Sequence, residues 1–201
     1  MILLTEAHYN PPIRYFWHVI RSESIQLEAH ENYIKQSYRN RCHVLTAQGV
    51  QPLSIPILKG NSKVKTPIRE IEIDYSQKWQ QVHWRTIQAA YGRAPYFEFY
   101  SDYIREVYER QPKFLFELNV DLLRLYLKLL KQDKSLTYTA AYQVQPPDHV
   151  LDLRNKLHPK IIPDNLHVKT YTQVFGKQFV SELSIIDLLF TQGPASISYL
   201  Q

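Results

Sequence analysis

Residues 30–42 hold the side chains best suited to chemistry in this chain. They combine imidazole, carboxylate, amide, phenol, ammonium and guanidinium groups in one short segment, a mixture that is untypical of a buried core. If the segment joins two strands, it lies at a strand end, where it can offer hydrogen-bond donors to an anionic ligand. On an extended backbone Arg39 and Arg41 point to one side, with Asn40 opposite, so two guanidinium groups could hold a phosphate. The alternative is a polar hairpin connection whose charges are solvated.

A second candidate is a histidine on an apolar helix face. Trp79, His83, Ile87 and Tyr91 are each four residues apart, which places them on nearly one face of a helix. A histidine in such a stripe is either a hydrogen-bonded core residue or a general base whose pKa is tuned by burial beside aromatic rings. His83 is therefore a candidate proton acceptor, and the core role is the alternative.

The motifs that are missing narrow the chemistry further. The chain has no glycine-rich phosphate loop, no nucleophile elbow of the serine hydrolases and no zinc-binding helix of the metalloproteases. No motif supports a metal site built from His30, Glu31 and His83, so we expect no metal, and the sequence names no cofactor. Cys42 is either a small apolar residue at the start of a strand or a nucleophile beside the cationic Arg41.

The elements that must position these groups follow from hydrophobic periodicity. Alternating β-formers predict strands at residues 25–29, 43–46, 52–58 and 68–73. Apolar spacings of three and four then predict helices over residues 77–91, 95–110 and 114–131. Further along we expect a strand at 136–142, a short helix at 152–157 and an apolar helix at 184–190. Strands first and helices later predict an α+β fold, in which a mixed sheet from the N-terminal half packs against helices from the middle and C-terminal part.

Composition excludes several classes of protein. The chain has 201 residues, of which 44% are hydrophobic and 21% charged, and its 15 Tyr and 12 Pro fit neither a disordered tail nor a coiled coil. We therefore expect one folded domain over residues 1–201. The single cysteine excludes an intrachain disulfide and indicates a reducing compartment, and no apolar run has the length of a signal-peptide core or a membrane span. These features predict a cytoplasmic protein.

The charge of the chain bears on its partners. The formal net charge of +5 is spread along the chain, and no recognised nucleic-acid-binding signature is present. We expect a small-molecule substrate rather than a nucleic acid, and keep nucleic-acid binding as a second alternative. The oligomeric state does not follow from the sequence.

The segments above, taken together, resemble the WbqC-like protein family. The resemblance rests on residues 30–42, on Trp79, residues 83–87 and Tyr91, and on residues 94–97, 116–119 and 183–190. These blocks occur in the same order over nearly the whole chain. Members of the family usually begin with a motif of the form P-x-Y-F-P, from which Tyr9, Pro11, Pro12, Tyr15 and Phe16 depart in spacing here.

The resemblance implies a role in bacterial surface polysaccharide and O-antigen synthesis, with transfer of an acyl or aminoacyl group to an amino sugar suggested for some members. Lys35, Tyr38, Asn40 and Arg41 match the polar segment of the family, and His83 and Tyr91 match its helix. In other members the position of His30 or Glu31 often falls in an Asp-containing segment, so the acid is expected to be supplied differently here.

Our leading hypothesis is therefore a transferase whose substrate carries phosphate, as an amino-sugar nucleotide does. We expect the basic side chains to bind the phosphates, the imidazole to take a proton from the attacking amine, and the tyrosines to contact the sugar and base. The candidate catalytic residues are His83 and Glu31, and the candidate substrate-binding residues are His30, Tyr33, Lys35, Tyr38, Arg39, Asn40, Arg41 and Tyr91. The alternative is a protein of the same pathway that binds a nucleotide sugar, or another ligand that carries phosphate, without chemistry.

Overall fold

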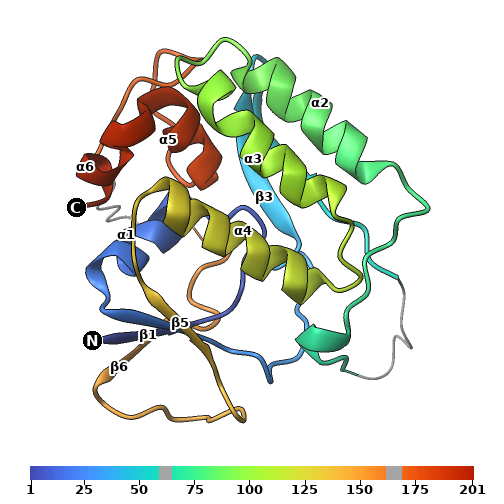
Figure 1. The fold of residues 1–201 in the computed structure, drawn as a ribbon, viewed down its shortest axis with the longest axis vertical. Helices are drawn as coiled ribbons and strands as arrows, with labels where there is room; N and C mark the ends of the chain where they lie inside the picture. Colours follow the sequence, from blue (N-terminus) through green and yellow to red (C-terminus); the bar gives the residue numbers. More distant parts are fainter. Residues whose placement is uncertain (59–64, 162–168) are drawn as a thin grey trace.

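A four-stranded sheet in the order β5-β2-β1-β6 carries the side chains discussed below (Figure 1). The structure is a computed structural model that describes residues 1–58, 65–161 and 169–201. The strands of this sheet are β1 (Ile2–Thr5), β2 (Ser24–Leu27), β5 (Ser135–Tyr138) and β6 (Val150–Asp152). Every pairing between them is parallel. The carboxyl ends of the four strands therefore meet along one edge.

A separate hairpin packs beside the helices. It consists of β3 (Arg41–Thr46) and β4 (Gly49–Ser54), paired antiparallel from Arg41 opposite Ser54 to Thr46 opposite Gly49. Gly49 has a φ of 103°, a backbone conformation that a residue with a Cβ atom rarely adopts. Together the two sheets combine parallel and antiparallel pairing.

The helices cover the sheets and form most of the core. They are α1 (Ile13–Arg21), α2 (Trp79–Tyr91), α3 (Phe97–Glu109), α4 (Leu115–Leu129), α5 (Ile185–Gln192) and α6 (Ser196–Leu200), with the short 3-10 helices η1 (Ile68–Glu70) and η2 (Gly193–Ala195). α4 lies in the middle of the molecule, and its leucines Leu115, Leu118 and Leu122 are fully buried (Figure 1). No helix within the described residues is long and apolar enough to span a membrane.

The predicted fold class is confirmed: N-terminal strands combine with helices from the middle and C-terminal part in an α+β arrangement. The predicted helices at 77–91, 95–110, 114–131 and 184–190 correspond to α2, α3, α4 and α5. The predicted strands at 25–29 and 43–46 correspond to β2 and β3, while those at 52–58 and 136–142 end sooner, at Ser54 and Tyr138.

Two local predictions were wrong, and one helix was not predicted. Residues 68–73 do not form a strand: Pro67 precedes the 3-10 helix η1, and the rest of the segment bonds to residues 113–115. Residues 152–157 do not form a helix, because Asp152 ends β6 and Asn155 has a φ of 60°, which stops helical propagation. The helix α1 was not foreseen, since its aromatic and β-branched residues are also strand formers.

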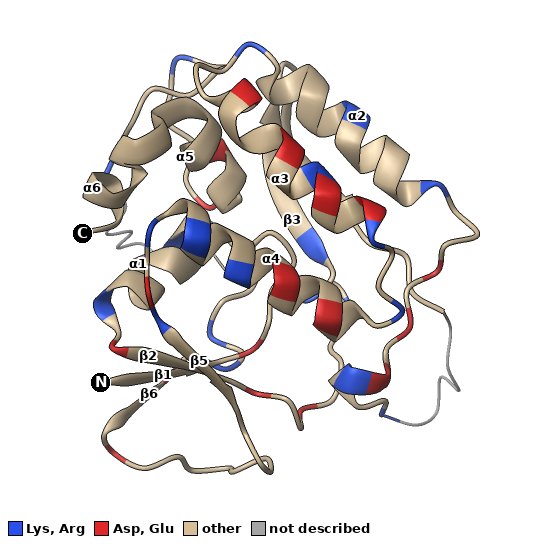
Figure 2. Cartoon of the chain, viewed as in Figure 1, with Lys and Arg blue, Asp and Glu red and all other residues tan. Residues whose placement is uncertain are grey.

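Charged residues are interspersed over the ribbon. In the view of Figure 2, residues of both signs lie along α3 and α4, α2 carries a single basic residue, and both signs occur near the strand ends. This distribution agrees with the scattered charge along the sequence and gives no support to nucleic-acid binding.

Candidate functional site

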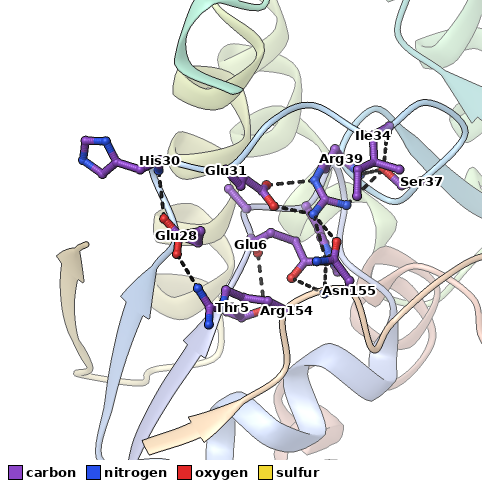
Figure 3. Close-up of polar contacts among 12 residues, drawn as sticks. Thr5, Glu6, Glu28, His30, Glu31, Ile34, Ser37, Arg39, Arg154 and Asn155 are labelled. Carbon is purple, nitrogen blue, oxygen red and sulfur yellow. Dashed lines mark hydrogen bonds and ion pairs between the residues drawn. The ribbon is translucent and has the colours of Figure 1, made fainter. Parts of the chain in front are cut away.

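Charged side chains follow the carboxyl ends of the parallel strands. Glu6 follows β1, Glu28 follows β2, Asp152 is the last residue of β6, and Arg154 lies two residues beyond it. Ligand sites of parallel sheets lie at this edge, because the loops that leave the strands there converge. We call the group the strand-end cluster; it comprises Glu6, Glu28, Glu31, Arg39, Asp152, Arg154 and Asn155 (Figure 3).

A buried ion pair between Glu31 and Arg39 lies at the centre of the cluster. Arg39 Nε donates to Glu31 Oε1 at 2.8 Å, and its Nη2 donates to Glu31 Oε2 and, at 2.8 Å, to Asn155 Oδ1. Arg39 is only 2% exposed and Glu31 only 5%. Burial raises the pKa of Glu31 despite the bonds from Arg39. Burial opposes the charge of Arg39, but its bonds to Glu31 and the field of Glu6 leave its pKa raised.

A second ion pair joins three of the parallel strands. Arg154 Nη1 donates to Glu28 Oε2 at 2.8 Å, and its Nε and Nη2 each donate to Asp152 at 3.0 Å. The other oxygen of Glu28 accepts from Thr139 Oγ1 at 2.7 Å and from the backbone of His30 at 2.9 Å. Because each oxygen of Glu28 has a partner, this pair fastens the ends of β2, β5 and β6 together.

Glu6 and His8 form the innermost part of the site. The carboxylate of Glu6 accepts from the backbone N–H of Asn155 at 3.2 Å and lies 3.5 Å from Arg39 Nη2. His8 Nε2 lies 3.4 Å from Glu6 Oε1, yet neither ring nitrogen of His8 has a hydrogen-bond partner within the described residues. Burial lowers the pKa of His8, so its imidazole is neutral at pH 7. Burial would raise the pKa of Glu6, but its contacts with His8 and Arg39 leave it lowered.

The charge balance of the cluster indicates its ligand. Its four carboxylates, on Glu6, Glu28, Glu31 and Asp152, form their ion pairs to guanidinium groups with Arg39 and Arg154, and Lys156 acts on Asp152 from farther away. Buried negative charge in excess favours a cationic group, such as the ammonium of an amine, over a phosphate. No group of three or more metal-ligating side chains within the described residues has a geometry that could hold a metal ion.

His83 belongs to a different network, which is aromatic and buried. Its Nδ1 lies 2.8 Å from Tyr9 Oη, which in turn lies 2.7 Å from Tyr108 Oη. Asn10 Nδ2 donates to the same Tyr108 hydroxyl at 2.8 Å, and Tyr126 donates to Asn10 Oδ1. Burial lowers the pKa of His83 to about 4, although an interaction with the backbone of residue 54 opposes the shift. The imidazole is therefore neutral, and one of its nitrogens is already bonded.

One loop supplies buried side chains to each network. Glu6 and His8 contact the strand-end cluster, whereas Tyr9 and Asn10 contact the aromatic network. Asn119 of α4 holds this loop against the turn before β3, because its Nδ2 donates to the backbone oxygens of residue 7 at 3.2 Å and residue 39 at 2.7 Å. The geometry of the two networks is thus coupled through the loop after β1.

The predicted basic clamp does not come together in the structure. Residues 38–40 form a turn, so the alternation of an extended backbone does not apply. Arg39 points inward to Glu31, while Arg41 Nε donates to Ser54 Oγ at 3.0 Å. Lys35 is exposed.

The other candidate substrate-binding residues are dispersed. Tyr38 and Tyr91 are buried, and Tyr91 Oη accepts from the backbone of residue 45 at 3.1 Å. Asn40 Nδ2 donates to the backbone of residue 55 at 2.9 Å, and Tyr33 is half-buried. The exposed ring of His30 points away from the strand-end cluster (Figure 3). Within the described residues, Glu31 and Arg39 alone of the predicted set bond to each other by their side chains.

Several residues of the site were missed from the sequence. Glu6, His8, Glu28, Arg154 and Asn155 were not singled out, although a signal existed. Each follows closely on a short run of β-formers, which is where a strand of a parallel sheet ends. This position after a strand indicates a shared site only when the strands are known to be parallel neighbours.

Comparison with known proteins identifies the family of the chain. The model of the WbqC-like protein family matches residues 6–162 and 161–199. The chain belongs to the WbqC-like protein family. The resemblance expected from the sequence is thereby confirmed, and the matched ranges contain the strand-end cluster and the aromatic network.

A curated relative matches this chain over nearly its whole length. The uncharacterized protein Rv1507c of Mycobacterium tuberculosis (strain ATCC 25618 / H37Rv) is 25% identical over 229 residues, which span 100% of this chain and 97% of that protein. No solved structure matches the chain. The function must therefore be argued from the site.

Proposed function

We propose that this WbqC-like protein is a transferase that moves an acyl or aminoacyl group to the amine of an amino-sugar nucleotide, in the synthesis of bacterial surface polysaccharide. One observation carries the proposal: the strand-end cluster holds four carboxylates, of which those of Glu6, Glu28 and Glu31 are buried, against two guanidinium groups. An amine-bearing substrate balances this excess when it binds as an ammonium ion. The family resemblance supports the sugar substrate.

The chemistry requires the amine to lose a proton. The amine nitrogen attacks the carbonyl carbon of an activated acyl donor such as a thioester, the C–N bond forms, and the bond from carbon to the leaving sulfur breaks. Glu31 accepts the proton of the amine, since burial raises the pKa of its carboxyl group and brings it closer to neutral pH. The bound ammonium releases one proton to solvent before it attacks, and Glu31 takes the second as the C–N bond forms. That second proton then passes to the departing thiolate, so the reaction yields an amide, a thiol and one proton in solution.

The remaining candidates take supporting parts. His83 is the second candidate base, because its imidazole is neutral, but its pKa of about 4 makes it a weaker proton acceptor. Asn155, which is exposed and accepts a hydrogen bond from Arg39, is available to the sugar, and Lys35 is exposed in the same segment as Glu31 and Arg39. His30, farther out, is available to the outer part of a larger substrate.

The first experiment compares amino-sugar nucleotides with the corresponding sugars that carry a hydroxyl in place of the amine. Calorimetry should give tighter binding of the amine form, and mass spectrometry should detect its acylated product in the presence of a thioester donor. Binding without product would favour the alternative, a non-catalytic binding protein. Equal binding of the amine and hydroxyl forms would refute the role of the carboxylates.

The second experiment tests Glu31 directly. Glu31→Gln preserves the shape of the side chain and should lower kcat by about 100-fold or more. Glu98→Gln on the exposed face of α3 is the matched control and should leave kcat unchanged. Thermal melts establish that each variant is folded. A folded Glu31→Gln variant with unchanged turnover would remove Glu31 from the mechanism.

A further inference from the structure

A groove of about 400 Å³ lies beside the strand-end cluster, between η1, the first half of α4 and the end of β5. Its volume is in the range of small-molecule sites. The side chains that matter for its chemistry are Arg69, Phe116, Glu117, Asp121, Arg124 and Tyr138.

Two backbone connections place the groove next to the candidate site. Tyr138 lines the groove, and the following residue, Thr139, bonds to Glu28 of the strand-end cluster at 2.7 Å. On the other side, the backbone N–H of Ile68, which precedes Arg69, donates to the carbonyl of Glu31 at 3.0 Å. The loop of residues 28–31 is therefore hydrogen-bonded to the neighbours of two residues that line the groove, and it also supplies carboxylates to the cluster.

Aromatic rings form one wall of the groove. The rings of Phe116 and Tyr138 lie 5.9 Å apart at an angle of 52°, and the guanidinium carbon of Arg69 lies 5.7 Å from the centre of each. Tyr138 is 37% exposed and Phe116 only 6%, so the accessible ring is that of Tyr138. Aromatic faces beside an arginine suit a flat π-system such as a nucleobase, which stacks on the rings.

Some polar side chains of the groove bond to one another, and others have donors or acceptors left for a ligand. Arg124 donates to Tyr138 Oη at 3.0 Å and lies 3.8 Å from Asp121. Arg69, in contrast, forms no ion pair or hydrogen bond with the described residues and is exposed, so its donors are available to a phosphate. The carboxylates of Glu117 and Asp121 can accept hydrogen bonds from ribose hydroxyls. Figure 2 shows acidic and basic residues close together along this part of α4.

We propose that this groove binds the nucleoside diphosphate part of the substrate. The base stacks on Tyr138, whose ring Phe116 supports, the ribose hydroxyls bond to the carboxylates of α4, and Arg69 binds the diphosphate. This assignment rests on the proposed function and extends it, because it separates the phosphate site from Arg39, whose charge is already balanced by Glu31. The sugar then reaches past the loop of residues 28–31 to the strand-end cluster.

The test is calorimetry with the full chain and UDP, ADP, uridine and pyrophosphate as probes. Arg69→Gln should weaken the binding of the diphosphates by about tenfold or more and leave the binding of uridine nearly unchanged. Tyr138→Leu should weaken the binding of uridine and of the nucleotides by about tenfold, with little effect on the binding of pyrophosphate. The matched controls are Arg85→Gln on α2 and Tyr103→Leu on α3, which are exposed residues outside the groove and should bind every probe as the wild type does.

The outcomes separate this inference from the proposed function. If no nucleoside diphosphate binds the wild type, or if binding survives Arg69→Gln and Tyr138→Leu, the groove assignment is refuted, whether or not amino sugars are acylated. If the diphosphates bind and the two variants lose them while no amino sugar is turned over, the groove assignment stands and the transferase proposal fails.

Discussion

The buried imidazole of His83 should make the stability of this protein depend on pH below about 6.5. Burial lowers the pKa of His83 from 6.5 to about 4. Between these values the unfolded chain binds a proton that the native protein excludes, so the free energy of unfolding falls as the pH falls. A shift of this size corresponds to ~3 kcal/mol, lost progressively from about pH 6.5 to about pH 4 and no further below that.

The surroundings of His83 explain why the charged form is disfavoured. The ring contacts the hydroxyl of Tyr9 and packs against Trp79, and Tyr108 lies one hydrogen bond farther along. The interaction that favours the charged form comes from the backbone of Ser54. No carboxylate among the described residues contacts the ring, so an imidazolium there has no counter-ion.

The assay is urea unfolding from pH 8 to pH 4 of the wild type and of a His83→Gln variant. His8, which is also neutral and buried, is present in each protein, so its contribution cancels in the difference. The wild type should lose about 3 kcal/mol more than the variant over this range. His149→Gln, at an exposed position, is the control and should follow the wild type. A difference between wild type and His83→Gln that does not change with pH, or an NMR titration of His83 near pH 6.5, would refute the reasoning.

Two further predictions concern Arg39 and Cys42. Arg39→Ala leaves the carboxylates of Glu31 and Glu6 buried without their main cation, so it should lower the free energy of unfolding in urea by about 3–5 kcal/mol. Arg41→Ala, at the surface, should lower it by less than about 1 kcal/mol. Equal losses in the two variants would contradict the placement of the two arginines. Cys42 is 1% exposed, and burial raises the pKa of its thiol to about 12. A disulfide reagent should therefore label Cys42 in urea and not in the native protein. Rapid labelling of the native protein would show that the thiol is not buried.

The regular helices could be predicted from the sequence because their signal is local. The leucines from Leu115 to Leu129 repeat at helical spacing, and α4 buries the face that the spacing defines. The stripe from Trp79 to Tyr91 likewise placed His83 on the buried face of α2. In contrast, residues 68–73 alternate like a strand but bond to the segment before α4, a pairing between distant parts of the chain that periodicity cannot show.

The candidate site was predicted only in part, for the same reason. The segment around Arg39 was recognised as unusual, yet the direction of the guanidinium group depends on a turn and on partners far away, such as Asn155. Glu6 and Glu28 look like ordinary strand-end residues until β1 and β2 are known to lie side by side. The sequence could therefore name the charged residues but not their pairing.

The amino-acid sequence by itself determined the helix faces, the α+β class and the family of this protein, because each depends on residue types at short spacing or on their order along the chain. Tertiary structure alone decided that four strands run parallel with their carboxyl ends together, and that Arg39 pairs with Glu31 in the interior. The physical reason is that charge balance in a buried site depends on which groups are within a few ångströms of one another, and that distance is set by the packing of segments remote in sequence.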